Sequence, residues 1–356
     1  MAAVYSNVAP ANITQALFPQ LMASASGSSS SASSSAIRLD SRSPSTPLGP
    51  AIRYSPSQRG VVTLTLSSPH STHATSTIVQ AAIHAELVEP RDERPYEGQV
   101  SVQVNPQMAL SMSSAARTSN QADALIADLE RRCDLALRRS GLIDREALCL
   151  KAGQLVWDVS IVLHLQSLQA GNALSASVMA AALALVDYRR NDAAVEAGGR
   201  IVVYHEDERV MVPLPIMGSL VAIEVAVFLP PAQAASAAAT AAAAAAKKKQ
   251  NRADGMDEDD EEEGEAMVAH SSSAGEPILL VDPTPLEVQL SSALLVFVLT
   301  PNTGQFLVSE KIGRTPVDVN VMIKAMQLAE NRARAMGEWQ EEQKTQRERR
   351  VGKDVV

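Results

Sequence analysis

Several short runs in the first half of the chain alternate apolar and polar residues, as strands with one buried face do. The alternation is regular at 60–66 and 99–104, and a further strand-like run covers 75–84. The longest alternating run is 157–165, and its apolar side carries Trp157, Val159, Ile161, Leu163 and Leu165. Two later runs, 221–229 and 294–299, also predict strands, and we expect 306–308 to pair with the second as a hairpin.

Three other segments have helical spacing. Between 119 and 139 the apolar residues recur every three or four positions, at Ile126, Leu129, Cys133 and Leu137. Segment 175–188 is rich in Ala with almost no polar face, which predicts a helix buried against a sheet. The third helix should start at Thr315-Pro316, since Thr can cap and Pro suits the first turn. Its expected apolar face is Val319, Met322, Ile323, Met326 and Ala333.

This order of elements predicts an α+β domain in which helices cover one face of a sheet. Two low-complexity segments divide it. Residues 24–36 are nearly all Ser, Ala and Gly, and 231–276 joins an alanine tract, Lys247 to Lys249 and an acidic run. We therefore expect a disordered tail at 1–36, folded parts at 37–230 and 277–337, an insert at 231–276 and a charged tail at 338–356. Residues 338–350 are charged on all sides, so we expect exposed helix or disorder there.

Composition narrows the classes of protein further. A chain of 356 residues with 46% hydrophobic content can form a substantial core. Two cysteines cannot supply a disulfide framework, and buried apolar roles for Cys133 and Cys149 are expected. No apolar stretch reaches the roughly 18 residues of a membrane span, so no membrane partner is expected. A net charge of −9 argues against coating nucleic acid unaided, although local basic patches could still act.

Motifs in a fixed order carry a family resemblance. Arg38-Leu39-Asp40-Ser41-Arg42 comes first, with Ser41 in place of the usual glycine. The block from Asp144 to Pro215 follows, with Leu148-Cys149, Trp157, Tyr188-Arg189-Arg190 and Glu208-Arg209-Val210, and then comes Val281-Asp282-Pro283-Thr284. This order resembles the RNase PH-like ring subunits of the eukaryotic RNA exosome.

The resemblance implies an RNase PH-like fold of two βαβα halves, related to the ribosomal protein S5 domain 2-like fold. It implies paralogous partners in a hetero-hexameric ring, with S1/KH cap subunits, an attached exoribonuclease and single-stranded RNA. The expected role is 3′–5′ RNA processing and degradation, including rRNA maturation and mRNA turnover. The expected location is the nucleus and nucleolus, and also the cytoplasm.

Active relatives in this family hold a metal with two aspartates separated by five residues. The resemblance places Leu286 and Ser292 at those positions, and neither side chain is an anionic ligand. Glu287 is one residue away, which in a strand would point it to the other face. The glycine-rich phosphate loop is replaced by Ser309-Glu310-Lys311-Ile312-Gly313, where Glu310 would repel phosphate. We therefore expect no catalytic residue, no metal and no cofactor.

The alternative is a phosphate-dependent 3′–5′ exoribonuclease, active alone or with a partner that supplies the acids. Fold alone is a weak argument for that activity. A third possibility, an interaction module whose acidic insert binds basic partners, does not explain Arg38 to Asp40.

RNA contact is predicted on the helix at 119–139. The family resemblance implies that Arg131 and Arg138 contact the RNA backbone, with Arg132 beside them. At Leu135, between them, the family pattern has a third arginine. Arg forks bind phosphate without reading sequence. The competing interpretation is an ordinary solvated helix face. Elsewhere, His164 is expected to be structural, Trp157 a core anchor and Arg189-Arg190 a helix cap or interface pair. Lys247 to Lys249 are a weak candidate for an import signal.

Overall fold

The computed structural model describes residues 38, 42, 46–68, 76–106, 119–196, 200–229, 277–313 and 315–354. The predicted tail at 1–36 and insert at 231–276 lie outside the described residues, as do Lys247 to Lys249. Within the described part of the chain, no helix is both long enough and apolar enough to span a membrane.

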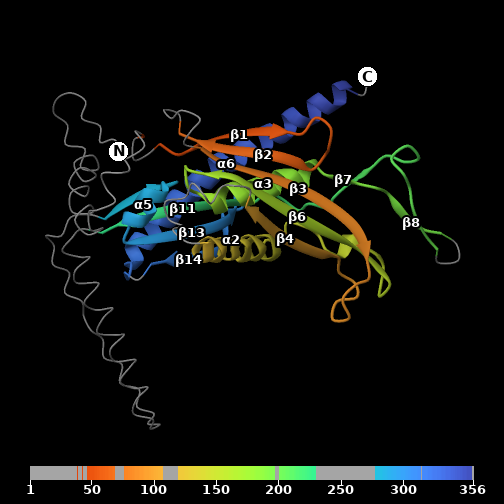
Figure 1. Ribbon diagram of the computed structural model, residues 1–356, viewed down its shortest axis with the longest axis horizontal. Helices are drawn as coiled ribbons and strands as arrows, with labels where there is room; N and C mark the ends of the chain where they lie inside the picture. Colours follow the sequence, from red (N-terminus) through yellow and green to blue (C-terminus); the bar gives the residue numbers. More distant parts are fainter. Residues whose placement is uncertain are drawn as a thin grey trace, which may run out of the picture.

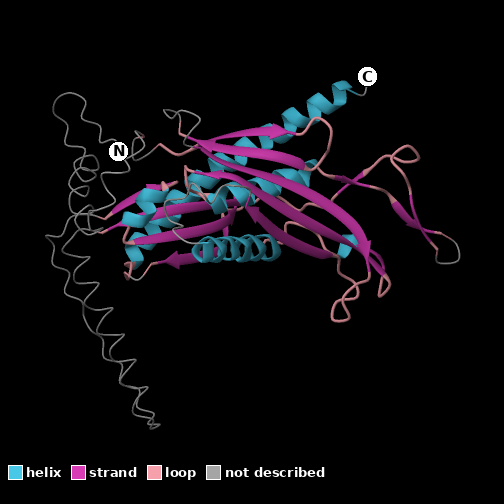
Figure 2. Ribbon diagram, in the orientation of Figure 1, coloured by secondary structure: helices cyan, strands magenta, loops and turns pink. Residues whose placement is uncertain are grey.

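The larger sheet has the strand order β1-β2-β3-β6-β4, with the short β5 paired to β6 (Figures 1 and 2). All its pairs are antiparallel except β4 with β6. The strands are β1 (Gly49–Tyr54), β2 (Val61–Ser67), β3 (Ser76–Val88), β4 (Gln99–Pro106), β5 (Cys149–Lys151) and β6 (Leu155–Leu168). In β6 the predicted apolar side, from Trp157 to Leu165, is buried. The alternating pattern therefore identified both the strand and the face it buries.

The second sheet is antiparallel with the order β12-β11-β13-β14. Its strands are β11 (Val221–Phe228), β12 (Ile278–Val281), β13 (Ala293–Thr300) and β14 (Gln305–Ile312). Every residue of β11 is buried, which explains its continuous apolar sequence. The predicted hairpin is present as β13–β14 and turns through residues 301–304.

In the described part of the chain, three long helices and one short helix accompany the two sheets. The main ones are α2 (Ser119–Arg139), α3 (Ala173–Asp187) and α6 (Val319–Asp354), and α5 (Pro285–Leu290) joins β12 to β13. Helix α3 packs on β2, β3 and β11, so it lies in the core between the two sheets (Figure 1). Helix α2 packs on β4 and α6 on β11 and β13. The α+β prediction is confirmed, with the alanines of α3 allowing close approach on all sides.

Small elements complete the larger half. A 3₁₀ turn, Glu146–Leu148, precedes β5, and two short ladders pair β7 (Arg189–Arg190) with β10 (Val212–Pro213) and β8 (Ala193–Val195) with β9 (Ile201–Val203). Figure 1 shows that β8 lies on an arm extending away from both sheets. These elements were not predicted from the sequence, because each is too short to show a periodic pattern of apolar residues.

Helix α6 differs from its prediction in two respects. It begins at Val319, so Thr315 and Pro316 lie before it in a non-helical segment. Val319 is 69% exposed and Ile323 48% exposed, whereas the buried face is Val321, Ala325, Ala329, Ala333 and Met336. Small alanines let the helix approach β11 and β13 closely, and the larger apolar residues lie at the margins. The predicted apolar face was therefore wrong at Val319 and Ile323, whereas Ala333 is buried and Met322 and Met326 pack, half-buried, against the core.

The same helix continues through the segment predicted as a tail charged on all sides. The boundary expected at 337/338 falls inside α6, which extends to Asp354. Gln340 is buried and Trp339 packs against the core. Arg347 Nε lies 2.8 Å from Asp187 Oδ1. This segment therefore presents one packed side, and the expectation that it is exposed all round was wrong.

Candidate functional site

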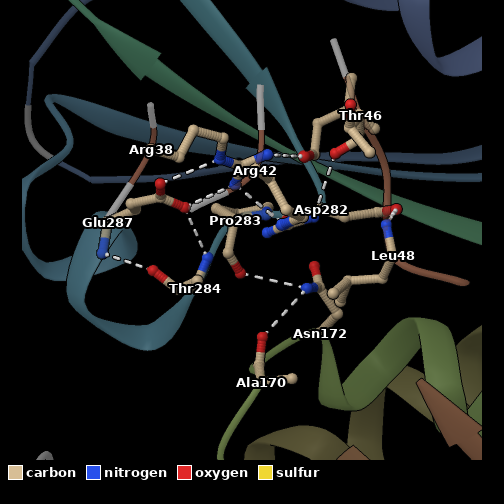
Figure 3. A network of polar contacts seen from close by, with 11 residues as sticks. Arg38, Arg42, Thr46, Leu48, Ala170, Asn172, Asp282, Pro283, Thr284 and Glu287 are labelled. Carbon is tan, nitrogen blue, oxygen red and sulfur yellow. Dashed lines mark hydrogen bonds and ion pairs between the residues drawn. The ribbon is translucent and has the colours of Figure 1, made fainter. Parts of the chain in front are cut away.

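The region to which the resemblance assigns the acids of active relatives follows β12 (Figure 3). A capping box starts α5: Glu287 N donates to Thr284 Oγ1 at 3.3 Å, and Thr284 N donates to Glu287 Oε2 at 2.8 Å. Glu287 therefore lies on a helix rather than on a strand, so the expected one-residue strand slip does not apply. Its side chain turns inward and is 3% exposed.

Glu287 is bound by an arginine from the far end of the sequence. Arg38 Nε donates to Glu287 Oε1 at 3.0 Å, and Arg38 Nη2 donates to Glu287 Oε2 at 2.5 Å. The guanidinium therefore binds both carboxylate oxygens. Both side chains are almost fully buried. A bidentate buried pair of this kind uses the acceptor capacity of the carboxylate that would otherwise serve a metal ion.

Asp282 is engaged in the same network. Its Oδ2 accepts from Leu48 N and lies near Arg332 Nη2, both at 3.1 Å. Its carbonyl oxygen accepts from Arg38 Nη2 at 3.0 Å and from Arg42 Nη2 at 2.8 Å. Asp282 and Glu287 thus lie in one cluster, but three arginines surround them. Within the described residues, no group of three or more His, Cys, Asp or Glu side chains is placed to hold a metal ion.

Leu286 and Ser292, the two positions that the resemblance assigned to the family's acids, have ordinary structural surroundings. Leu286 is on α5 and 38% exposed. Ser292 Oγ accepts from Leu229 N at 3.2 Å, tying the end of β11 to the start of β13. Neither side chain carries the negative charge that a hard metal ion prefers.

Glu224, which the sequence analysis missed, is a buried acid beside this network. The backbone N–H groups of Leu174 and Ser175, at the start of α3, donate to its carboxylate. Burial, and secondarily the charge of Asp282, raises the pKa of Glu224 to about 7. Nearby, Asn172 has a left-handed φ of 55° and donates to Pro283 O at 3.1 Å. A single charged residue within the apolar run 221–229 was the signal available in the sequence.

Two of the three predicted RNA-binding arginines, Arg131 and Arg132, share the same two acids. Arg131 Nη2 lies 3.0 Å from Asp128 Oδ1 and 3.4 Å from Glu310 Oε1. Arg132 reaches the other oxygens of the same two acids, at 2.5 and 3.2 Å. Glu310, expected to repel phosphate, therefore joins β14 to α2, and much of the charge of Arg131 and Arg132 is offset.

The third arginine belongs to a different cluster. Arg138 lines a groove of about 430 Å³ between the end of α2 and the loop that joins β3 to β4. Five arginines line this groove, which we call the arginine groove: Arg91, Arg94, Arg138, Arg139 and Arg145. Glu93 and Glu97 are the acids that line it, and Glu97 pairs with Arg94 at 3.0 Å. Arg138 pairs with Asp134 on its own helix. Arg131 and Arg138 share a helix but not a cluster.

The remaining candidates have structural surroundings. Arg189 Nη1 donates to the carbonyls of Val186 and Tyr188 at 2.8 and 2.9 Å, which confirms a helix-capping role. Arg190 stacks over the buried Trp157 ring at 5.0 Å, and Trp157 is confirmed as a core residue. Cys133 is also buried, and burial raises the pKa of its thiol to about 12.

Comparison with solved structures identifies the fold. A chain titled "archaeoglobus fulgidus exosome with RNA bound to the active site" superposes with a TM-score of 0.59 at 16% identity, over 92% of this chain and 98% of that one. A chain of the "Archaeal exosome core" gives 0.55 at 16% identity, over 93% and 99%. The model of the 3′ exoribonuclease family, domain 1, matches residues 53–191. The protein has an RNase PH-like α+β fold.

Sequence relatives are named exosome complex components. Zebrafish (Danio rerio) RRP45 is 34% identical over 155 residues, which are 43% of this chain and 38% of that protein. Arabidopsis thaliana RRP45B is 35% identical over 156 residues, 43% of this chain and 34% of that protein. Fission yeast (Schizosaccharomyces pombe) rrp45 is 32% identical over 154 residues, 43% of this chain and 50% of that protein. The matched segment thus spans between a third and a half of these relatives.

Proposed function

We propose that this chain is a non-catalytic subunit of an exosome core ring, which supports assembly and guides single-stranded RNA to a separate nuclease. The observation that carries the proposal is the arginine-filled network after β12. Asp282 and Glu287 are the acids nearest the family's metal-binding positions. Arg38 and Arg332 already pair with their carboxylate oxygens, and Arg42 donates to the backbone carbonyl of Asp282. Freeing those oxygens for a metal ion would leave buried arginines without partners, at a cost of several kcal/mol.

The proposed partners are paralogous RNase PH-like subunits in a hetero-hexameric ring, with S1/KH cap subunits and an attached exoribonuclease. Relatives named RRP45 and the fold of the archaeal exosome core support this. Within that family, the motif order favours the subunit called exosome component nine. A role in rRNA maturation would place the chain in the nucleus and nucleolus, and a role in mRNA turnover would place it also in the cytoplasm.

The proposed RNA contact is the arginine groove, with Arg138 as its link to the family pattern and Arg131 and Arg132 as minor contributors. Phosphate attracts guanidinium groups regardless of base sequence, as a subunit that handles many RNAs requires. Arg91 and Arg139 make no ion pair among the described residues, so their charge is available.

Native mass spectrometry of the chain co-expressed with the other five RNase PH-like paralogues from its source tests the assembly. We expect a one-to-one pair or a six-subunit ring that contains this chain. A homomeric ring, or a chain that ignores all five paralogues, would reject the proposal.

Activity is tested separately. The purified chain and the assembled ring without its nuclease are incubated with single-stranded RNA, inorganic phosphate and Mg²⁺. We expect no release of nucleoside diphosphates above background. Phosphate-dependent release that disappears on changing Asp282 or Glu287 would instead establish an exoribonuclease.

A further inference from the structure

A continuous groove runs along the C-terminal half of α6, far from the network after β12. Two adjoining cavities of about 280 and 340 Å³ form it, and both are lined by Leu183, Val186, Arg189, Lys344 and Glu348. We call it the α3–α6 groove. Each cavity has room for one or more side chains of a ligand.

The floor of this groove is apolar. Leu183 and Val186 come from the last turns of α3, and Leu214 and Ile216 come from the segment after β10. These aliphatic side chains suit other apolar side chains, because burying apolar surface is favourable without any fixed direction.

The rim carries an excess of positive charge. Four cations line the groove, Arg59, Arg189, Lys344 and Arg347, with three acids, Asp187, Glu341 and Glu348, and Lys344 Nζ lies 3.9 Å from Glu341 Oε2. Asp187 is already engaged, since its carboxylate accepts from Gly60 N at 3.0 Å and from Arg347 Nε at 2.8 Å. The whole chain has a net charge of −9, so this local excess runs against its average.

Two of the rim arginines, Arg59 and Arg189, line the same cavity without an acid paired to either among the described residues. Burial, followed by the nearby charge of Arg59, lowers the pKa of Arg189. Arg189 donates only to backbone carbonyls, and neither arginine makes an ion pair with any residue that the structure describes. A carboxylate placed between them would offset their repulsion with charge-assisted hydrogen bonds.

We propose that the α3–α6 groove binds a short peptide segment of a partner protein that carries carboxylates beside apolar side chains. The apolar side chains would lie on Leu183, Val186 and Ile216, and the carboxylates at Arg59, Arg189 and Lys344. RNA fits this groove less well. Its only described aromatic lining residue is Tyr54, whose ring is covered by Arg347 at 4.9 Å, so no free ring is available for base stacking.

The test is fluorescence anisotropy with the purified full chain and a labelled short peptide that alternates Glu and Leu. Peptides that alternate Lys with Leu and Glu with Ser are the controls for charge and for apolar contact. Arg59→Glu combined with Lys344→Glu should weaken binding of the Glu–Leu peptide by roughly tenfold or more. Val186→Thr, which keeps the shape of the side chain, should weaken it without altering the charge.

Arg200→Glu combined with Arg334→Glu is the matched control, because both arginines are exposed, away from the groove and paired with a glutamate on the surface. It should bind like the unchanged chain. Equal loss in both double variants, equal binding of all three peptides, or no binding would overturn the proposal. So would a labelled single-stranded RNA that binds through Arg59 and Lys344 while the peptide does not. The assay uses the chain alone, so its outcome is independent of ring assembly.

Discussion

Glu224 is a buried acid whose protonation should couple folding to pH. Its pKa rises from 4.5 to about 7 because burial disfavours the charged form. Between those two values the folded state holds a proton that the unfolded state has released. The free energy of unfolding therefore falls as the pH rises from about 4.5 to about 7, and this contribution is constant above that range.

Glu224→Gln should remove this dependence. Glutamine keeps an oxygen for the N–H groups of Leu174 and Ser175 but carries no charge. At pH 8 the variant should be more stable than the unchanged chain by an amount on the order of 3 kcal/mol, and at pH 5 by about 1 kcal/mol or less. Urea unfolding at both pH values measures the difference. A gain of the same size at pH 5 would show that ionisation is not the cause.

Arg38 and Glu287 provide a second prediction at the scale of single residues. Arg38→Ala leaves a buried carboxylate without its partner, so we expect a loss of about 3–5 kcal/mol in unfolding free energy. Arg94→Ala is the control, because it breaks an exposed pair with Glu97 and should cost about 1 kcal/mol or less.

The double variant Arg38→Met with Glu287→Leu removes both charges and should recover much of that loss, as measured by chemical unfolding. If Arg38→Ala lowers the free energy of unfolding no more than Arg94→Ala does, then Arg38 does not bind the Glu287 carboxylate in solution. Glu287 would then be free for other ligands.

Helix α6 makes a close crossing that the sequence does not reveal. A Cβ placed on Gly337 would lie 2.5 Å from the Cβ of Pro301, in the turn between β13 and β14. Gly337 is therefore required by packing, although alanine is the better helix former by about 1 kcal/mol.

Gly337→Ala should lower the thermal unfolding midpoint despite the gain in helix propensity. Adding Pro301→Gly should restore part of the loss, because it removes the Cβ and Cγ atoms of Pro301, which would lie 2.5 and 2.9 Å from the new methyl group. Thermal unfolding followed by circular dichroism compares the three chains. A higher midpoint for Gly337→Ala alone would show that the turn yields easily and that the crossing is loose.

How well each helix or strand could be predicted depends on how clearly its apolar and polar residues separate into a buried and a solvated face. Helix α2 was predicted with both ends, and β6 with its buried face, because each has one solvated and one buried side. The face of α6 was missed because alanines, rather than its larger apolar residues, form the contact. Strands β1 and β12 were not predicted, since the first is mostly exposed and the second is only four residues long.

The candidate sites are built from residues far apart in the sequence, so they could be predicted less well than the helices and strands. The assignment of Leu286 and Ser292 to the family's acid positions stays a prediction from the resemblance, and the pairing of Arg38 with Glu287 joins residues 249 positions apart. The arginine groove gathers Arg91 and Arg94 from a loop and Arg138 from a helix. Spacing along one helix therefore suggested Arg131 as a partner of Arg138, whereas the fold places Arg131 against Glu310.

This arrangement predicts unequal roles for the two arginine pairs on α2. Arg138→Glu with Arg139→Glu should markedly reduce crosslinking of single-stranded RNA to the assembled ring, because it reverses charge in the arginine groove. Arg131→Glu with Arg132→Glu makes the same change in charge on the same helix. Its effect should be smaller, because Asp128 and Glu310 already offset those two arginines.

Crosslinking yields and the salt dependence of RNA binding measure both variants in parallel, with ring assembly checked by native mass spectrometry. Each lost phosphate contact should reduce the slope of log affinity against log salt by about 1. The slope should therefore fall more for the Arg138 and Arg139 pair than for the Arg131 and Arg132 pair. The reverse order would indicate that RNA runs along the α2–β14 side of the molecule. Equal slopes in both variants and the unchanged chain would indicate that neither pair contacts RNA.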